Sequence, residues 1–179
     1  EYGSRALVHF GGDYLRKNGL LDRIEASLRA AGIAFVEYDG VVPNPRLSTV
    51  KEGIRLCREN QLDFVLAIGG GSAIDCMEGD LWDCFTGKAQ VQKALPIGVV
   101  LTIPASGSES SKACIITKDE GSQKRMCSSP HILPKFAILD PETTYTLPAY
   151  QTAAGCCDIM SHLMERYFPQ TEQVDFTDR

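Results

Sequence analysis

One stretch decides the fold: residues 64–75 read FVLAIGGGSAID. Phe64–Ile68 is an unbroken apolar run with the length of a buried strand, and three glycines follow it before Ser72 and a helix start. The missing side chains would let the backbone approach a pyrophosphate, while the amides of the helix start and the Ser72 hydroxyl would donate to it. The alternative is a tight strand-to-helix turn that binds nothing. Neither GxGxxG nor the P-loop pattern is present.

Short apolar runs alternate with longer amphipathic segments on both sides of this stretch. The alternation predicts an α/β fold with a Rossmann-like, mostly parallel sheet and flanking helices. Leucines and isoleucines at helical spacing predict a helix that Gly32 ends, and a second helix near residues 47–56 has Ser48 as its expected N-cap. Strands are expected at residues 6–10, 34–38, 64–68, 97–103, 114–117 and 136–139.

Composition restricts the class of protein. The 179 residues carry 18 Lys and Arg against 23 Asp and Glu, a formal net charge of −5, which argues against a nucleic-acid partner. No apolar run reaches the ~18–20 residues of a membrane helix, so we expect a soluble, cytoplasmic protein without a membrane partner. Seven cysteines without a CxxC pair are expected to be reduced thiols, mostly buried.

Two more loops follow predicted strands. Residues 101–110 are rich in hydroxyls and small side chains, with Thr102 and Ser106 among them, and Gly11 and Gly12 follow the first strand. Open α/β sheets bind ligands at the carboxyl ends of their strands, so both loops are candidates for one site. For Gly11 and Gly12 the alternative is a plain turn.

An aspartate and a histidine stand four residues apart late in the chain. Leu147-Pro148 precedes an apolar pattern that predicts a helix through about Tyr167, with Pro169 as its stop. Asp158 and His162 would project from one face of this helix and could share a divalent cation. Read alone, the two residues also fit a surface pair.

These motifs resemble those of the iron-containing (group III) alcohol dehydrogenases, in particular the butanol-dehydrogenase-like branch. By this resemblance, residues 1–147 are a dinucleotide-binding α/β domain and residues 148–179 are the incomplete start of a metal-binding helical domain. The matching stretches are residues 39–45, 67–75, 101–109, 134–141 and 154–162.

The resemblance implies hydride transfer between a nicotinamide cofactor and a primary alcohol or aldehyde, with a divalent metal as Lewis acid. It places Asp158 and His162 among the ligands of that metal, with Fe²⁺ expected first and Zn²⁺ as the alternative. NADP(H) is favoured over NAD(H), because family members that use NAD carry an aspartate where this chain has Gly11; Asp13 argues the other way. The implied cofactor residues are Gly11, Gly12, Gly70, Gly71, Ser72, Asp75, Thr102, Ser106 and Lys124, of which Lys124 could also be a plain solvated charge.

Some features depart from the family pattern. The two remaining metal histidines of the family are absent here, so the 179 residues are expected to be an inactive fragment. The segment near Cys76–Gly79 is shorter than the family pattern. Either the protein has a deletion there, or residues are missing from the sequence. A glycerol-dehydrogenase or dehydroquinate-synthase-like enzyme and a non-catalytic nucleotide-binding module remain as alternatives. The physiological substrate and the oligomeric state, for which a homodimer is one option, stay open.

Overall fold

A five-stranded sheet organises the chain in the computed structural model, which describes residues 1–69, 81–121 and 123–168. All four strand pairs are parallel, in the order β2-β1-β3-β4-β7. The predicted Rossmann-like α/β fold is therefore confirmed. The strands are β1 (Arg5–Phe10), β2 (Ala34–Asp39), β3 (Phe64–Gly69), β4 (Ile97–Leu101) and β7 (Phe136–Leu139).

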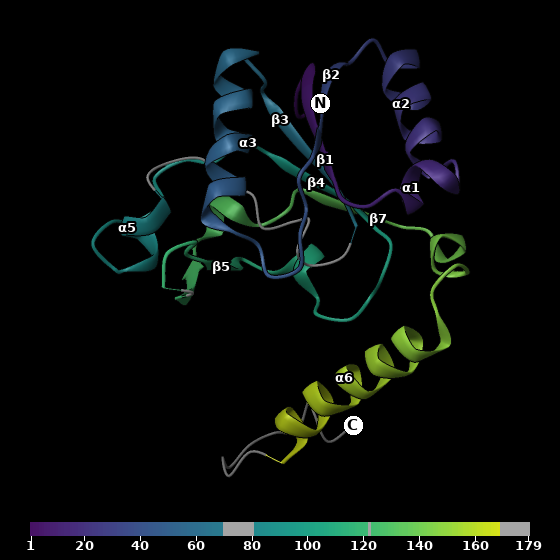
Figure 1. Ribbon diagram of the computed structural model, residues 1–179, viewed down its shortest axis with the longest axis vertical. Helices are drawn as coiled ribbons and strands as arrows, with labels where there is room; N and C mark the ends of the chain where they lie inside the picture. Colours follow the sequence, from purple (N-terminus) through teal and green to yellow (C-terminus); the bar gives the residue numbers. More distant parts are fainter. Residues whose placement is uncertain (70–80, 122, 169–179) are drawn as a thin grey trace.

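Helices α2 and α3 cover opposite faces of this sheet (Figure 1). Alternate residues of β1 point to the two sides: Ala6, Val8 and Phe10 pack with α2, whereas Leu7 joins the cluster that contains Cys57 of α3. Every residue of β3 is buried, as expected for a parallel strand covered on both faces. The helices are α1 (Tyr14–Lys17), α2 (Leu20–Ala30), α3 (Leu47–Glu59), α5 (Leu81–Phe85) and α6 (Ala149–Tyr167), with 3₁₀ turns η1 (Ser108–Ser110), η2 (Pro130–Ile132) and η3 (Pro141–Thr144).

The predicted strand at residues 114–117 lies outside the main sheet. It is β5 (Ala113–Thr117), which pairs antiparallel with β6 (Lys124–Ser128) in a separate two-stranded sheet. The sequence pattern did not predict β6, because only Cys127 of its five residues is buried. This hairpin docks on the residues that lead into α3, where the Thr117 N–H donates to the Pro45 carbonyl oxygen at 2.8 Å.

The start of α3 is capped from the same hairpin. The predicted N-cap, Ser48, is wrong: α3 begins at Leu47 and its N-cap residue is Arg46. Instead, the Asp119 carboxylate accepts from the Ser48 N–H at 2.9 Å and from the Ser48 hydroxyl at 2.6 Å. These hydrogen bonds, chiefly that of the hydroxyl, lower the pKa of Asp119.

Helix α6 extends away from the sheet (Figure 1). It begins at Ala149 and ends at Tyr167, close to the predicted span; Pro169 lies outside the described residues. Among its residues only Gly155 is buried, where an added Cβ would lie 3.7 Å from the Pro104 carbonyl oxygen. No helix in the described ranges is both long and apolar enough to span a bilayer.

Candidate functional site

The carboxyl ends of the parallel strands lie at one edge of the sheet. There β1 leads into Gly11, β3 ends at Gly69, β4 leads into Thr102 and β7 leads into Asp140. Strand order reverses between β1 and β3, since the chain passes from β1 to β2 on one side and from β3 to β4 on the other. Such a reversal is where open α/β sheets bind ligands, so this edge is the candidate site.

The two glycines after β1 have different roles. At Gly11 an added Cβ would lie 2.5 Å from Val41 Cβ and 2.7 Å from the Val41 carbonyl oxygen, so packing against the loop after β2 already requires glycine. Gly12 is exposed and has a φ of +87°, a backbone conformation that glycine adopts without strain. Of the two, Gly12 is the one that is open to a ligand.

The glycine run after β3 is described only at its first residue. Gly69 has a φ of +144° and its carbonyl oxygen accepts from the Thr102 N–H at 3.2 Å. The other residues predicted to hold the cofactor there lie outside the described residues: Gly70, Gly71, Ser72 and Asp75. Their role stays a prediction.

Thr102 is a buried hydroxyl residue at this edge. Its Oγ1 lies 2.9 Å from the hydroxyl of Tyr14, the first residue of α1. The neighbouring Leu101 carbonyl oxygen accepts from the Thr143 hydroxyl of η3 at 3.1 Å. Sequence reasoning missed Tyr14 and Thr143, because no pattern within either segment indicates a contact between distant loops.

Ser106 and Lys124 are not close partners of Thr102. Ser106 is exposed, and its Oγ lies 2.7 Å from the Oγ of Ser108. Lys124 lies on β6, where its Nζ donates to Asn44 Oδ1 at 2.9 Å. Asn44 belongs to the loop after β2, so Lys124 ties the small hairpin to the loop that also packs on Gly11.

Asp158 and His162 lie on one face of α6, as their spacing predicts. Asp158 Oδ2 and His162 Nε2 are 3.7 Å apart, a separation that one ion at about 2.1 Å from both atoms can span. Both side chains are about half exposed, and Glu165 Oε2 lies 4.0 Å from the other ring nitrogen of His162. The donor types fit Fe²⁺ or Zn²⁺. Within the described residues, however, no cluster of three or more such donors exists.

An apolar crevice of about 200 Å³ lies between the loop after β4 and α6. Gly155 and Ile159 contribute to it and lie on the same helical stripe as His162, one to two turns before it. The crevice is lined by Ile103, Pro104, Thr144, Leu147, Gln151, Thr152, Gly155, Cys156 and Ile159.

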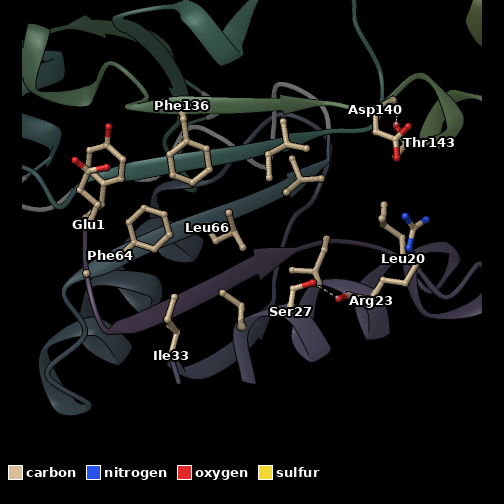
Figure 2. Close-up of a pocket in the computed structure, with 16 residues that line it drawn as sticks. Glu1, Leu20, Arg23, Ser27, Ile33, Phe64, Leu66, Phe136, Asp140 and Thr143 are labelled. Atoms are coloured by element: carbon tan, nitrogen blue, oxygen red, sulfur yellow. Dashed lines mark hydrogen bonds between the residues drawn. The ribbon is translucent and has the colours of Figure 1, made fainter. Parts of the chain in front are cut away.

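A larger open cavity of about 430 Å³ lies between α2 and the sheet (Figure 2). Phe64, Leu66 and Phe136 form its apolar floor, and Arg23 lies near the end at which Asp140 and Thr143 are found. None of the described residues that line it is a cysteine or a histidine. Its described lining therefore offers no carboxylate–imidazole pair like that of α6.

Together, the parallel sheet and the strand ends at its reversal point define a Rossmann-like α/β protein, in which Asp158 and His162 form a carboxylate–imidazole pair on α6. The chain belongs to the iron-containing alcohol dehydrogenase family, whose sequence model matches residues 1–141. This confirms the family resemblance found in the sequence.

Individual relatives agree with the family assignment. The chain is 47% identical over 181 residues to NADH-dependent butanol dehydrogenase A of Clostridium acetobutylicum, covering 96% of this chain and 46% of that protein. It is 35% identical over 190 residues to the NADPH-dependent aldehyde reductase YqhD of Escherichia coli, covering 99% and 49%. The structure of NADH-dependent butanol dehydrogenase A from Thermotoga maritima superposes with a TM-score of 0.91 at 39% identity, covering 98% and 46%. The chain thus spans about half the length of these relatives.

Proposed function

We propose that this chain is the nucleotide-binding part of a metal-dependent, NAD(P)-linked alcohol dehydrogenase that interconverts a primary alcohol and an aldehyde. The observation that carries the proposal is the meeting of the β1, β3 and β4 ends at one edge, with the buried Thr102 hydroxyl between them, in a chain of this family. The names of the relatives, butanol dehydrogenase and aldehyde reductase, support a small alcohol or aldehyde as substrate.

The candidate site residues that the structure describes would have separate roles in this reaction. Gly12 would let the dinucleotide approach the backbone at the end of β1, and Thr102 would present a fixed hydroxyl beside it. Asp158 and His162 would hold the divalent metal, which when bound supplies a Lewis acid for the substrate oxygen. The apolar crevice beside α6 would exclude water from an alkyl substituent of the substrate.

The preferred cofactor depends on opposing features of the β1 loop. Gly11 has no carboxylate that could repel the 2′-phosphate of NADPH, and this favours NADPH. Asp13 is exposed next to it, and the butanol dehydrogenases at 43–47% identity are named NADH-dependent. Calorimetric affinities for NADH and NADPH, measured on the same preparation, separate these alternatives.

A non-catalytic nucleotide-binding module is the second candidate. It is favoured by the donor count, because catalytic metal sites use three protein ligands or more and the described residues bring together only two. We therefore expect residues 1–179 alone to bind nicotinamide cofactor without reducing aldehydes.

Two experiments test the proposal: calorimetry of this chain with NADH, and an assay of butanal reduction by a longer chain, of the length of the relatives, that supplies further metal ligands. Gly71→Val should weaken NADH binding at least tenfold at an unchanged thermal unfolding midpoint, because a branched side chain would occupy the expected phosphate position. Wild-type affinity for NADH in this variant would contradict the expected binding of the pyrophosphate by the glycine run. Glycerol and a phosphorylated sugar acid in the same panel test the alternative enzymes on this scaffold, and turnover with either would overturn the butanol-dehydrogenase-like assignment.

A further inference from the structure

We propose that Tyr14 is a positioning residue of the dinucleotide groove. Its side chain holds the loop after β1 at a fixed distance from the loop after β4. The inference rests on the proposed function, since it assigns the residue that sets the width of that groove. Nothing in the sequence pattern around Tyr14 indicates this role.

The hydrogen bond of Tyr14 joins the loops of two strands that are not neighbours in the sheet. Its hydroxyl lies 2.9 Å from Thr102 Oγ1, and the two residues are 88 positions apart in the chain. In the sheet, β3 lies between β1 and β4, so the tyrosine side chain reaches from one loop to the other over the carboxyl end of β3. This end is Gly69, the last described residue before the glycine run.

Thr102 gives this bond a rigid end. The residue is 2% exposed, and its N–H also donates to the Gly69 carbonyl oxygen at 3.2 Å. Thr102 is therefore fixed to β3 through its backbone and to the β1 loop through its side chain. Loss of the Tyr14 hydroxyl removes only the second connection.

The other end of the bond is held by local packing. A Cβ at Gly12 would lie 3.3 Å from Cδ1 of the Tyr14 ring, so the glycine backbone rests against the tyrosine. Leu15, the next residue, is fully buried and anchors the start of α1. The residue remains 43% exposed, which leaves part of its surface open to a ligand at the strand ends.

The chemistry of the pair favours a defined direction. A phenol is a stronger acid than an aliphatic alcohol, so Tyr14 is the better donor and Thr102 the better acceptor. The Thr102 proton then remains for another acceptor. A dinucleotide is long enough to touch both loops, and a groove whose width is already set binds it with less ordering than two independent loops would.

Tyr14→Phe separates positioning from folding, because it removes the hydroxyl and keeps the ring. We expect about fivefold weaker NADH binding by calorimetry, the loss of one net hydrogen bond. AMP, which lacks the nicotinamide half of the dinucleotide and gains less from a groove of fixed width, should lose less affinity than NADH when measured by ligand-observed NMR. Tyr150→Phe, a change at an exposed tyrosine on α6, is the matched control and should leave both affinities unchanged.

A double-mutant cycle with Thr102→Val completes the test. Thr102→Val should lose at least as much affinity as Tyr14→Phe, and the double variant should lose no more than Thr102→Val alone, because the two changes remove the same bond. Unchanged NADH affinity in Tyr14→Phe would overturn the positioning role, as would equal losses for NADH and AMP with a lowered unfolding midpoint. A wild-type chain that binds neither NADH nor AMP would instead refute the proposed function itself, and the positioning role with it.

Discussion

The imidazole of His9 stacks on the ring of Tyr38 from the neighbouring strand, with ring centroids 5.0 Å apart. Its Nδ1 lies 3.2 Å from the Tyr38 carbonyl oxygen, which fits a neutral ring whose Nδ1–H donates. The residue is 2% exposed, and burial lowers the pKa of His9 to about 4 even though the nearby Asp39 charge and the hydrogen bond act in the opposite direction.

This histidine should make the protein sensitive to mild acid. The unfolded chain takes up the proton at the ordinary pKa of about 6.5 and the folded chain only near pH 4, so stability is retained above pH 6.5 and lost as the pH falls towards 4. The loss due to His9 is roughly 3 kcal/mol in the free energy of unfolding, measured by urea denaturation across this range. His9→Gln should flatten the dependence; an equally steep profile in this variant would contradict the assignment.

Alanine substitutions at two glycines should change the free energy of unfolding in opposite directions. A Cβ at Gly98 in β4 would lie 2.8 Å from ring atoms of both Phe64 and Phe136, so Gly98→Ala should destabilise by about 2 kcal/mol through overpacking. Gly53 in α3 has its nearest such neighbour at 3.6 Å, an ordinary contact. Gly53→Ala should therefore stabilise by about 0.5–1 kcal/mol. Thermal and urea unfolding of both variants measure the contrast, and equal signs would refute it.

The cysteines should differ sharply in reactivity. Cys156 and Cys157 are exposed on α6, whereas Cys57, Cys114 and Cys127 are buried, and burial raises the pKa of Cys127. Among the described cysteines, we expect iodoacetamide to modify Cys156 and Cys157 first under native conditions, as measured by mass spectrometry of the peptides. Replacing both by serine should leave only slow labelling among the described cysteines. Fast labelling of Cys114 in the native protein would contradict the packing of the hairpin.

Metal binding to α6 should be weak and should depend on both donors. We expect Co²⁺ to bind this chain with an absorption change that Asp158→Ala or His162→Ala abolishes, since each removes half of a two-ligand set. His131→Ala is the control, because His131 lies on η2. A change that persists in both α6 variants would place the metal elsewhere.

Sequence reasoning was most successful where periodicity reports burial. The apolar runs located all five strands of the main sheet to within two residues at each end. It was least successful at polar edges: β6 exposes four of its five residues, so its pattern resembles that of a loop. A predicted strand that ran to Ile103 ends at Leu101, because its pairing with Gly69 of β3 and with Leu139 of β7 stops there.

The same limit applies to the candidate site. Helical spacing was enough to bring Asp158 and His162 together, because the two residues share one helix. Tyr14 with Thr102, and Lys124 with Asn44, are joined only through the arrangement of distant loops. Local spacing carries no information on such pairs.

The contact at the buried Gly155 also sets the direction of α6, and so the position of His162. His162 lies seven residues beyond this contact, which is about 10 Å along a helix axis, so a tilt of about 10° at Gly155 displaces the imidazole by about 2 Å. Metal–ligand distances tolerate only about 0.2 Å. A larger side chain at Gly155 would meet Pro104 and Ala105 first, and the helix would have to swing to make room. A substitution that touches neither ligand would thereby move both of them out of range of any donor fixed elsewhere.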